Sequence, residues 1–188
     1  MLLGAWIGLE FAPSSMKKPE FLLISLGLAA GTMLLTVITQ KTPLGYLFFG
    51  AFTFFIGFFN TPVVSVVSNG SALTQIIEQA FLITAGITGA ITLYVFISKK
   101  DFSFLKGFLF VGLIGVVIMT VIGLFWNNDL MQFVIAGMGA ILFSLFILFD
   151  TSRLIHKKGT PIEIAIALFL DIINLFWIIV KILILTKR

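Results

Sequence analysis

The sequence has 188 residues, of which 60% are hydrophobic and only 11% are charged. Soluble domains carry about 25% charged residues, so this composition excludes a soluble protein and indicates an integral membrane protein. The chain has no cysteine, which excludes disulfides, thiolate metal sites and cysteine nucleophiles. The net charge of +4 does not indicate nucleic-acid binding, because the basic residues lie mostly in short connectors, where they set membrane topology.

Seven hydrophobic segments follow one another along the chain. The first, residues 1–12, is too short to span a bilayer, which needs roughly 20 helical residues, and we expect it to be a truncated or partial helix. The other six are expected at residues 20–39, 44–67, 76–98, 102–126, 130–152 and 161–185. Their short connectors predict adjacent antiparallel helices in a single domain over residues 1–188. The predicted fold class is an all-α integral membrane protein, a seven-transmembrane-helix bundle.

The basic residues predict the orientation in the membrane. The connectors after the second, fourth and sixth segments, with their flanks, hold seven of them: Lys41, Lys99, Lys100, Lys106, Arg153, Lys157 and Lys158. The opposite side holds five: Lys17, Lys18, Lys181, Lys187 and Arg188. Because cytoplasmic loops carry the excess of basic residues, we place these three connectors in the cytoplasm. The absence of cysteine fits a bacterial inner membrane.

The last segment carries polar residues on one stripe. Glu163, Asp171, Asn174 and Lys181 lie at offsets of 8, 3 and 7, which place them on one side of a helix. A helix with a polar stripe and apolar flanks belongs inside a bundle, so we expect the last helix to be central. Interhelical hydrogen bonding explains Asn174 well. It explains Asp171 less well, because a carboxylate at bilayer depth costs at least ~2.5 kcal/mol.

Asp150 lies about one turn inside the cytoplasmic end of the sixth segment. One interpretation pairs it with Arg153 at a solvated helix end. The other brings it to Asp171 across the short connector, which requires the sixth helix to continue past Arg153. Two carboxyl groups that meet in apolar surroundings titrate as a unit and hold one proton over some pH range. Such a pair would be a proton-operated clamp between the last two helices.

The remaining candidate residues offer oxygen ligands. Glu78 opens the fourth segment, and Asn60 precedes a proline that interrupts the third. Oxygen ligands suit a hard cation such as Ca²⁺ rather than zinc, and Asp171 is the residue we expect to meet a passing Ca²⁺. We expect no tightly bound cofactor. The sequence has no Gly-x-Ser-x-Gly, His-Glu-x-x-His or Walker motif, so we do not expect an enzyme.

Four stretches resemble the Bax inhibitor-1 family, also called the transmembrane BAX inhibitor motif family. They are DTSRLI (150–155), ALFLDIINLF (167–176), KKDFSFL (99–105) and TPLGY (42–46). The resemblance implies a seven-helix bundle with the last helix at its centre, acting as a pH-sensitive Ca²⁺ leak channel. It places Asp150 and Asp171 at the two positions of a di-aspartyl sensor. Glu78, Asn174, Arg153 and Asn60 are then supporting or ion-path candidates.

The same resemblance supports an alternative function. One bacterial branch of the family is associated with a membrane-anchored ATP-dependent protease, so the chain is alternatively a membrane regulator that binds such a protease, or another membrane partner, without ion flux. The chain departs from the family pattern in its short first helix. It also has Thr39 or Gln40 where some members have an arginine, so a latch built on that arginine is in doubt.

Overall fold

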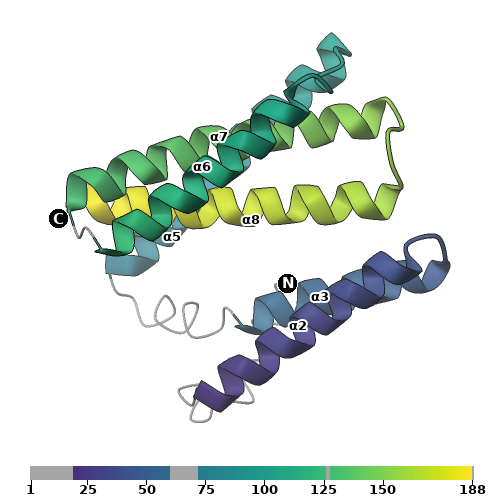
Figure 1. Cartoon of the computed structure of the whole chain (residues 1–188), viewed down its shortest axis with the longest axis horizontal. Helices are drawn as coiled ribbons and strands as arrows, with labels where there is room; N and C mark the ends of the chain where they lie inside the picture. Colours follow the sequence, from purple (N-terminus) through teal and green to yellow (C-terminus); the bar gives the residue numbers. More distant parts are fainter. Residues whose placement is uncertain (1–18, 60–71, 126–127, 188) are drawn as a thin grey trace. The chain divides into compact units, whose positions relative to one another are not determined.

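The computed structural model describes residues 19–59, 72–125 and 128–187. Within these ranges all regular structure is α-helical (Figure 1). The helices are α2 (Pro19–Thr39), α3 (Pro43–Phe59), α5 (Ala72–Ser98), α6 (Leu105–Phe125), α7 (Asp129–Ile155) and α8 (Pro161–Thr186). The predicted all-α class is confirmed. The first segment, residues 1–12, and Asn60 lie outside the described residues, so the count of seven helices stays a prediction.

Four of the described helices are long and apolar enough to cross a membrane. These spans are Thr74–Ser98, Leu105–Gly123, Asp129–Ile155 and Pro161–Thr186. Two shorter apolar helices cover Gly27–Thr39 and Pro43–Gly57. The spans expose large apolar side chains, such as Ile97 at 81% and Leu82 at 69%, a surface that suits lipid rather than water. The prediction of an integral membrane protein is confirmed.

The described residues divide into two compact units, and each is described by itself. In the first, residues 1–75, α2 and α3 pack together as a helical hairpin. The carbonyl of Thr39 accepts hydrogen bonds from the N–H of Thr42 at 2.9 Å and from its hydroxyl at 2.8 Å, which closes the turn. Pro43 then begins α3, a position that suits proline because the first helical N–H has no partner.

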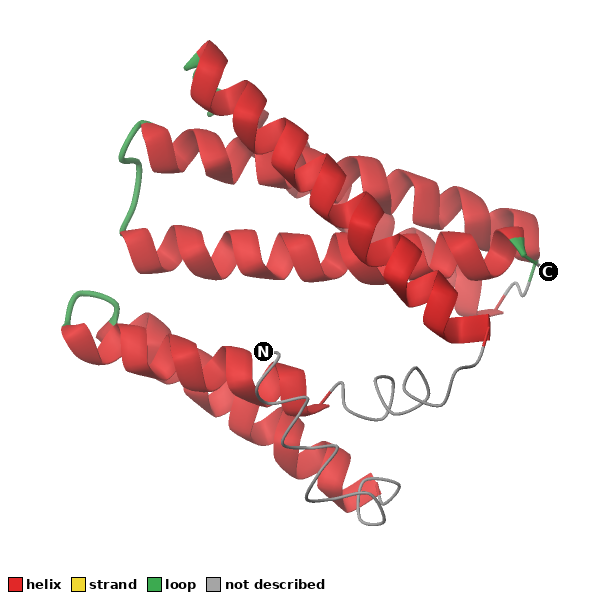
Figure 2. Ribbon diagram, turned by 180° about the vertical axis from the view of Figure 1, so that it is seen from behind, coloured by secondary structure: helices red, strands yellow, loops and turns green. Residues whose placement is uncertain are grey.

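In the second unit, residues 76–188, α7 and α8 lie side by side and α6 crosses α7 at an angle (Figures 1 and 2). Two glycines permit this close packing. A Cβ on Gly139 of α7 would lie 2.9 Å from Cδ1 of Ile178 on α8. A Cβ on Gly112 of α6 would lie 2.8 Å from Cδ1 of Leu142 on α7. Within this unit α7 therefore packs closely against both α6 and α8.

The end of α7 has a defined cap. The N–H of Lys157 donates to the carbonyl of Leu154 at 3.3 Å, and the N–H of Lys158 donates to the carbonyl of Arg153 at 2.9 Å. These are the two hydrogen bonds of a Schellman motif. Lys157 adopts the left-handed conformation that the motif requires, with φ of 53°. The cap turns the chain sharply at the end of the helix.

The start of α8 follows within a few residues. Thr160 is its N-cap, and the Thr160 hydroxyl accepts a hydrogen bond from the N–H of Glu163 at 3.2 Å. Pro161 occupies the first helical position, where its fixed φ favours the helix. Because residues 156–160 form so short a connector, α8 returns directly beside α7.

The predicted helix boundaries agree with the structure to within a few residues. The fourth predicted segment, residues 76–98, begins earlier in the structure, at Ala72. The sixth, residues 130–152, ends later, because α7 continues to Ile155. The polar run of residues 150–153 interrupts the apolar pattern, so apolarity alone placed the end of α7 too early. The predicted segment 44–67 is described only as far as Phe59, the end of α3. Neither the single domain over residues 1–188 nor the central position of the last helix is tested by the described units.

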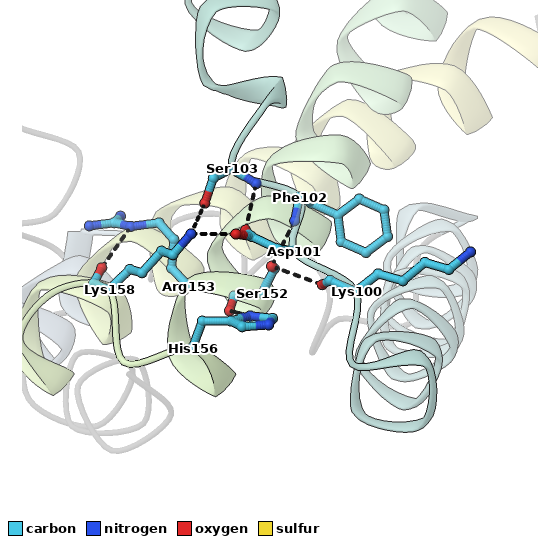
Figure 3. Close-up of polar contacts among 8 residues, drawn as sticks. All are labelled: Lys100, Asp101, Phe102, Ser103, Ser152, Arg153, His156 and Lys158. Carbon is cyan, nitrogen blue, oxygen red and sulfur yellow. Dashed lines mark hydrogen bonds and ion pairs between the residues drawn. The ribbon is translucent and has the colours of Figure 1, made fainter.

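The connector between α5 and α6, residues 99–104, is fixed to the end of α7 by Ser152 (Figure 3). The Ser152 hydroxyl accepts a hydrogen bond from the N–H of Phe102 at 3.0 Å and donates to the carbonyl of Lys100 at 3.2 Å. Ser152 is 2% exposed. One buried hydroxyl thus satisfies two main-chain groups of the connector.

Lys158 makes the second attachment of the same connector (Figure 3). Its ammonium donates to the carboxylate of Asp101 at 2.5 Å and to the hydroxyl of Ser103 at 2.8 Å. We refer to the contacts of Ser152 and Lys158 with residues 100–103 as the connector clamp. Hydrogen bonds from Lys158 and Ser103 hold the pKa of Asp101 well below its usual range.

The lowered pKa fixes the pH range over which the connector clamp is intact. A carboxyl whose pKa is lowered on folding stabilises the fold above its ordinary pKa of about 3.9 and loses that effect only as pH falls further. Asp101 is therefore ionised from about pH 5 upwards. A pH response of this end of the protein near neutrality must come from other groups.

Replacing Ser152 with alanine should destabilise the protein. The substitution leaves the N–H of Phe102 without its acceptor, and an unsatisfied buried donor costs about 1–3 kcal/mol. For a chain of this size, that lowers Tm by about 2–4 °C per kcal/mol, measured by thermal unfolding in detergent. The matched control is Ser144→Ala on the same helix, because the Ser144 hydroxyl donates to the carbonyl of Ala140 within α7. Equal Tm values for the two variants would contradict the role given to Ser152.

Candidate functional site

The carboxyl groups of Asp150 on α7 and Asp171 on α8 face each other. Asp150 is 4% exposed and Asp171 is 7% exposed. The two carboxyl groups lie near enough to interact with each other. Because α7 continues to Ile155 and the connector is short, the last turns of α7 lie beside the first half of α8. Asp150 is therefore at a buried helix–helix contact and not at a solvated helix end.

Arg153 connects the buried pair to the surface. Its Nη1 donates to Asp150 Oδ1 at 2.8 Å, and its Nη2 donates to Glu163 Oε1 at 2.6 Å. The Arg153 side chain is 20% exposed, whereas that of Glu163 is 48% exposed. Its Nε donates to the carbonyl of Lys158 at 3.2 Å. Asp150 thus lies beside Asp171 and also pairs with Arg153, but this ion pair is at a buried helix contact and not at the solvated helix end of the first interpretation.

Hydrogen-bond donors are distributed unequally between the two acids. Asp150 receives the Arg153 guanidinium, whereas Asp171 Oδ2 is buried and has no hydrogen-bond partner among the described residues. Buried polar atoms nearly always have a partner, and two adjacent carboxylates repel each other. One proton shared by the pair removes both costs, because it lowers the total charge and supplies the missing donor. The geometry is therefore suited to a singly protonated pair.

Gly159 brings the main chain of the α7–α8 connector against the ion pair of Arg153 and Glu163. Its φ of 131° is a conformation that other residues rarely adopt. A Cβ at this position would lie 3.0 Å from Arg153 Nη2 and 3.3 Å from Glu163 Oε2. Glycine is thus required both for the turn and for the approach of the chain to the guanidinium.

The polar stripe predicted on the last helix is only partly buried in the structure. Of its four residues, Asp171 is buried, Lys181 is half-buried, and Glu163 and Asn174 are exposed. Lys181 donates to Gln132 Oε1 at 2.6 Å, and Gln132 Nε2 donates to the carbonyl of Gly123 at 2.8 Å. These bonds join α8, α7 and α6 about ten residues, or ~15 Å, beyond Asp171.

The other predicted site residues lie away from the aspartate pair. Glu78 is exposed and lies twenty residues before the end of α5 at Ser98, about 30 Å along the helix from the connector end. Asn60 lies outside the described residues. Among the described ranges no cluster of three or more His, Asp or Glu side chains is suited to hold a metal ion. The contact between Asp171 and a passing Ca²⁺ stays a prediction.

Sequence reasoning did not identify three side chains that join the elements of this unit. Ser152 and Lys158 bond to residues about fifty positions earlier in the chain, and such partners leave no periodic pattern. At the other end of α7, Gln132 bonds to Lys181, and no motif in the sequence indicates this contact. The run of polar residues after Asp150 was an available signal, but a solvated helix end explains that run equally well.

Comparison with known proteins identifies relatives of the chain. The model of the family described as Inhibitor of apoptosis-promoting Bax1 matches residues 1–188. An uncharacterised protein of Campylobacter jejuni is 36% identical over 145 residues, which are 77% of this chain and 63% of that protein. An uncharacterised protein of Helicobacter pylori is 33% identical over 183 residues, 96% of this chain and 78% of that protein.

A viral relative has a descriptive name. The Golgi anti-apoptotic protein of vaccinia virus strain Lister is 40% identical over 105 residues, 54% of this chain and 44% of that protein. The matched residues make up 63%, 78% and 44% of these three relatives, so the chain spans only part of their length. The family match nevertheless covers the whole chain, and the helices have the length and apolarity of membrane spans. This chain belongs to the Bax inhibitor-1 family of membrane proteins.

Proposed function

We propose that this protein is a pH-sensitive calcium leak channel whose gate is the pair of Asp150 and Asp171. One observation carries the proposal: two carboxyl groups, each less than a tenth exposed, face each other between paired membrane helices. Ionisable residues inside a membrane protein are costly, and they commonly mark ion or proton pathways. Membership of the Bax inhibitor-1 family supports the same function.

The gate works through a shared proton. At lower pH one proton joins the two carboxyl groups and holds α7 against α8. When the proton leaves at higher pH, Arg153 neutralises Asp150, but Asp171 keeps an uncompensated charge in apolar surroundings. Such a charge costs several kcal/mol, and separation of the helices relieves the cost by admitting water and cations. The open form is thus favoured by rising pH.

Calcium is the permeant ion in this proposal and not a bound cofactor. Hard cations take oxygen ligands, and the ionised Asp171 carboxylate supplies them with a negative charge. Glu78 and Asn174 are further candidates for the ion path, as is Asn60. The protein then lies in a bacterial inner membrane, with the α2–α3, α5–α6 and α7–α8 connectors in the cytoplasm, as the excess of basic residues predicts.

Asp171→Asn tests the gate directly. Asparagine has the shape of a protonated aspartate and donates a hydrogen bond to Asp150 at every pH, so the helices stay clamped. In liposomes, Ca²⁺ uptake by the wild type should rise between about pH 6 and 8, by up to about tenfold per pH unit because one proton controls the gate. Uptake by Asp171→Asn should be low and independent of pH.

The matched control is Asp129→Asn, which removes a carboxylate from the first turn of α7 and should keep the pH dependence. A pH profile of Asp171→Asn that follows the wild type would contradict the sensor. Wild-type uptake no greater than in empty liposomes at any pH would contradict the channel. That outcome would favour the alternative, a membrane regulator of a membrane-anchored ATP-dependent protease or another membrane partner, with the two acids as structural contacts.

Arg153→Gln should move the pH profile of uptake. The substitution removes the positive charge that stabilises ionised Asp150, so the pair holds its proton to higher pH. Because a hydrogen bond to a charged group contributes about 1.5–3 kcal/mol, the midpoint of uptake should rise by about one pH unit or more. Arg153→Lys should retain most of the wild-type profile. Glu163→Gln, which leaves the contact between Arg153 and Asp150 in place, should shift the midpoint little, and an unchanged midpoint in Arg153→Gln would disprove the coupling.

A further inference from the structure

A cavity of about 420 Å³ opens where three membrane spans reach the same end of the second unit. It is lined by Ser103, Lys106, Phe149, Arg153, Lys158 and Glu163. These residues come from the α5–α6 connector, the start of α6, the end of α7, the α7–α8 connector and the start of α8. The cavity therefore lies at the level where the apolar spans end and lipid headgroups begin.

The charges around this cavity are unbalanced. Six basic residues lie on the two connectors and the adjoining helix ends at this end of the unit, Lys99, Lys100, Lys106, Arg153, Lys157 and Lys158, against three acidic residues, Asp101, Asp150 and Glu163. Of these, Lys106, Arg153, Lys158 and Glu163 line the cavity. Arg153 contacts both Asp150 and Glu163, and Lys158 contacts Asp101. The surplus of charge at this end of the unit is therefore positive, and the single charge of Arg153 is shared between two carboxylates.

Lys106 contributes to the cavity lining a positive charge that no described ion pair uses. Its side chain is exposed and has no ion pair with any described residue. Two other lining groups that donate hydrogen bonds, the ammonium of Lys158 and the hydroxyl of Ser103, lie 2.8 Å apart (Figure 3). The cavity lining thus includes hydroxyl, ammonium and guanidinium groups, and such donors bind phosphate groups in proteins.

Apolar surface adjoins these donors. Phe149 lines the cavity, and Phe104, which follows the lining residue Ser103 directly in the chain, is 76% exposed. A free phosphate ion has no apolar part that could contact this surface, whereas the acyl chains of a phospholipid can pack against it. Basic pockets between membrane helices at the cytoplasmic side are suited to anionic headgroups.

We propose that this cavity binds the phosphate-bearing headgroup of an anionic phospholipid, with Lys106 as the principal charge contact. Ser103 and Lys158 supply hydrogen bonds to the phosphate, and Phe149 and Phe104 contact the acyl chains. The site requires no ion conduction. Binding and Ca²⁺ flux are separate measurements, so this proposal and the channel proposal can fail independently.

The test uses the full chain in detergent micelles, titrated with dioleoyl phosphatidylglycerol. Lipid adducts are counted by native mass spectrometry, and Tm is followed in parallel. We expect phosphatidylglycerol to bind and raise Tm, and dioleoyl phosphatidylcholine to do so far less. Lys106→Gln should weaken the apparent affinity for phosphatidylglycerol about fivefold, the effect expected of one basic residue near a membrane surface. Lys106→Arg should retain the affinity.

The matched control is Lys41→Gln in the α2–α3 turn, which removes the same charge from another exposed lysine and should leave the affinity unchanged. Equal weakening by Lys106→Gln and Lys41→Gln would overturn the proposal, because general surface charge would then explain the binding. Unchanged affinity in Lys106→Gln would also overturn it. A rise in Tm with inorganic phosphate as large as that with phosphatidylglycerol would show that the cavity takes a free anion and would overturn the lipid assignment.

Discussion

The contact between Asp150 and Asp171 is the constraint on which the rest of the second unit depends. Two carboxyl groups between apolar helices are stable only with a proton, a counter-charge or water. The structure supplies a counter-charge to Asp150 through Arg153 and leaves Asp171 Oδ2 without a partner among the described residues. In the proposed function a proton shared with Asp150 supplies that partner, and it would then be part of the packing between α7 and α8.

The neighbouring features keep Arg153 in place for this contact. The Schellman motif at the end of α7 directs the carbonyl of Lys158 towards the guanidinium. Gly159 brings the connector close enough to enclose it. Glu163 is held at the start of α8 by the Thr160 cap and takes the outer side of the same group. These features all lie within a short stretch of sequence, and together they hold the Arg153 guanidinium beside the buried acids.

Much of the fold could be predicted from the sequence, because the length of an apolar segment is a strong indicator of a membrane-spanning helix. The spans of α5, α6 and α8 follow directly from the hydrophobic runs. The short connector favours a contact between Asp150 and Asp171, but the sequence left open whether the sixth helix continues past Arg153. That end could not be decided, because a solvated helix end explains the polar run of residues 150–153 equally well. The bonds of Ser152 and Lys158 to the distant α5–α6 connector depend on the tertiary packing that places this connector beside the end of α7. No local sequence pattern predicts that packing.

The connector clamp has a mechanical consequence. Ser152 and Lys158 fasten the end of α7 to the α5–α6 connector through several hydrogen bonds, one of them from a buried hydroxyl. The start of α8 is held to α7 by the ion pair of Arg153 with the exposed Glu163, whereas its far end is joined to α7 by Lys181. Asp171 thus lies between two polar contacts of α8 with α7. Loss of the exposed contact at Glu163 would leave α8 attached to α7 beyond Asp171 by Lys181 and by the packing of Ile178 against Gly139.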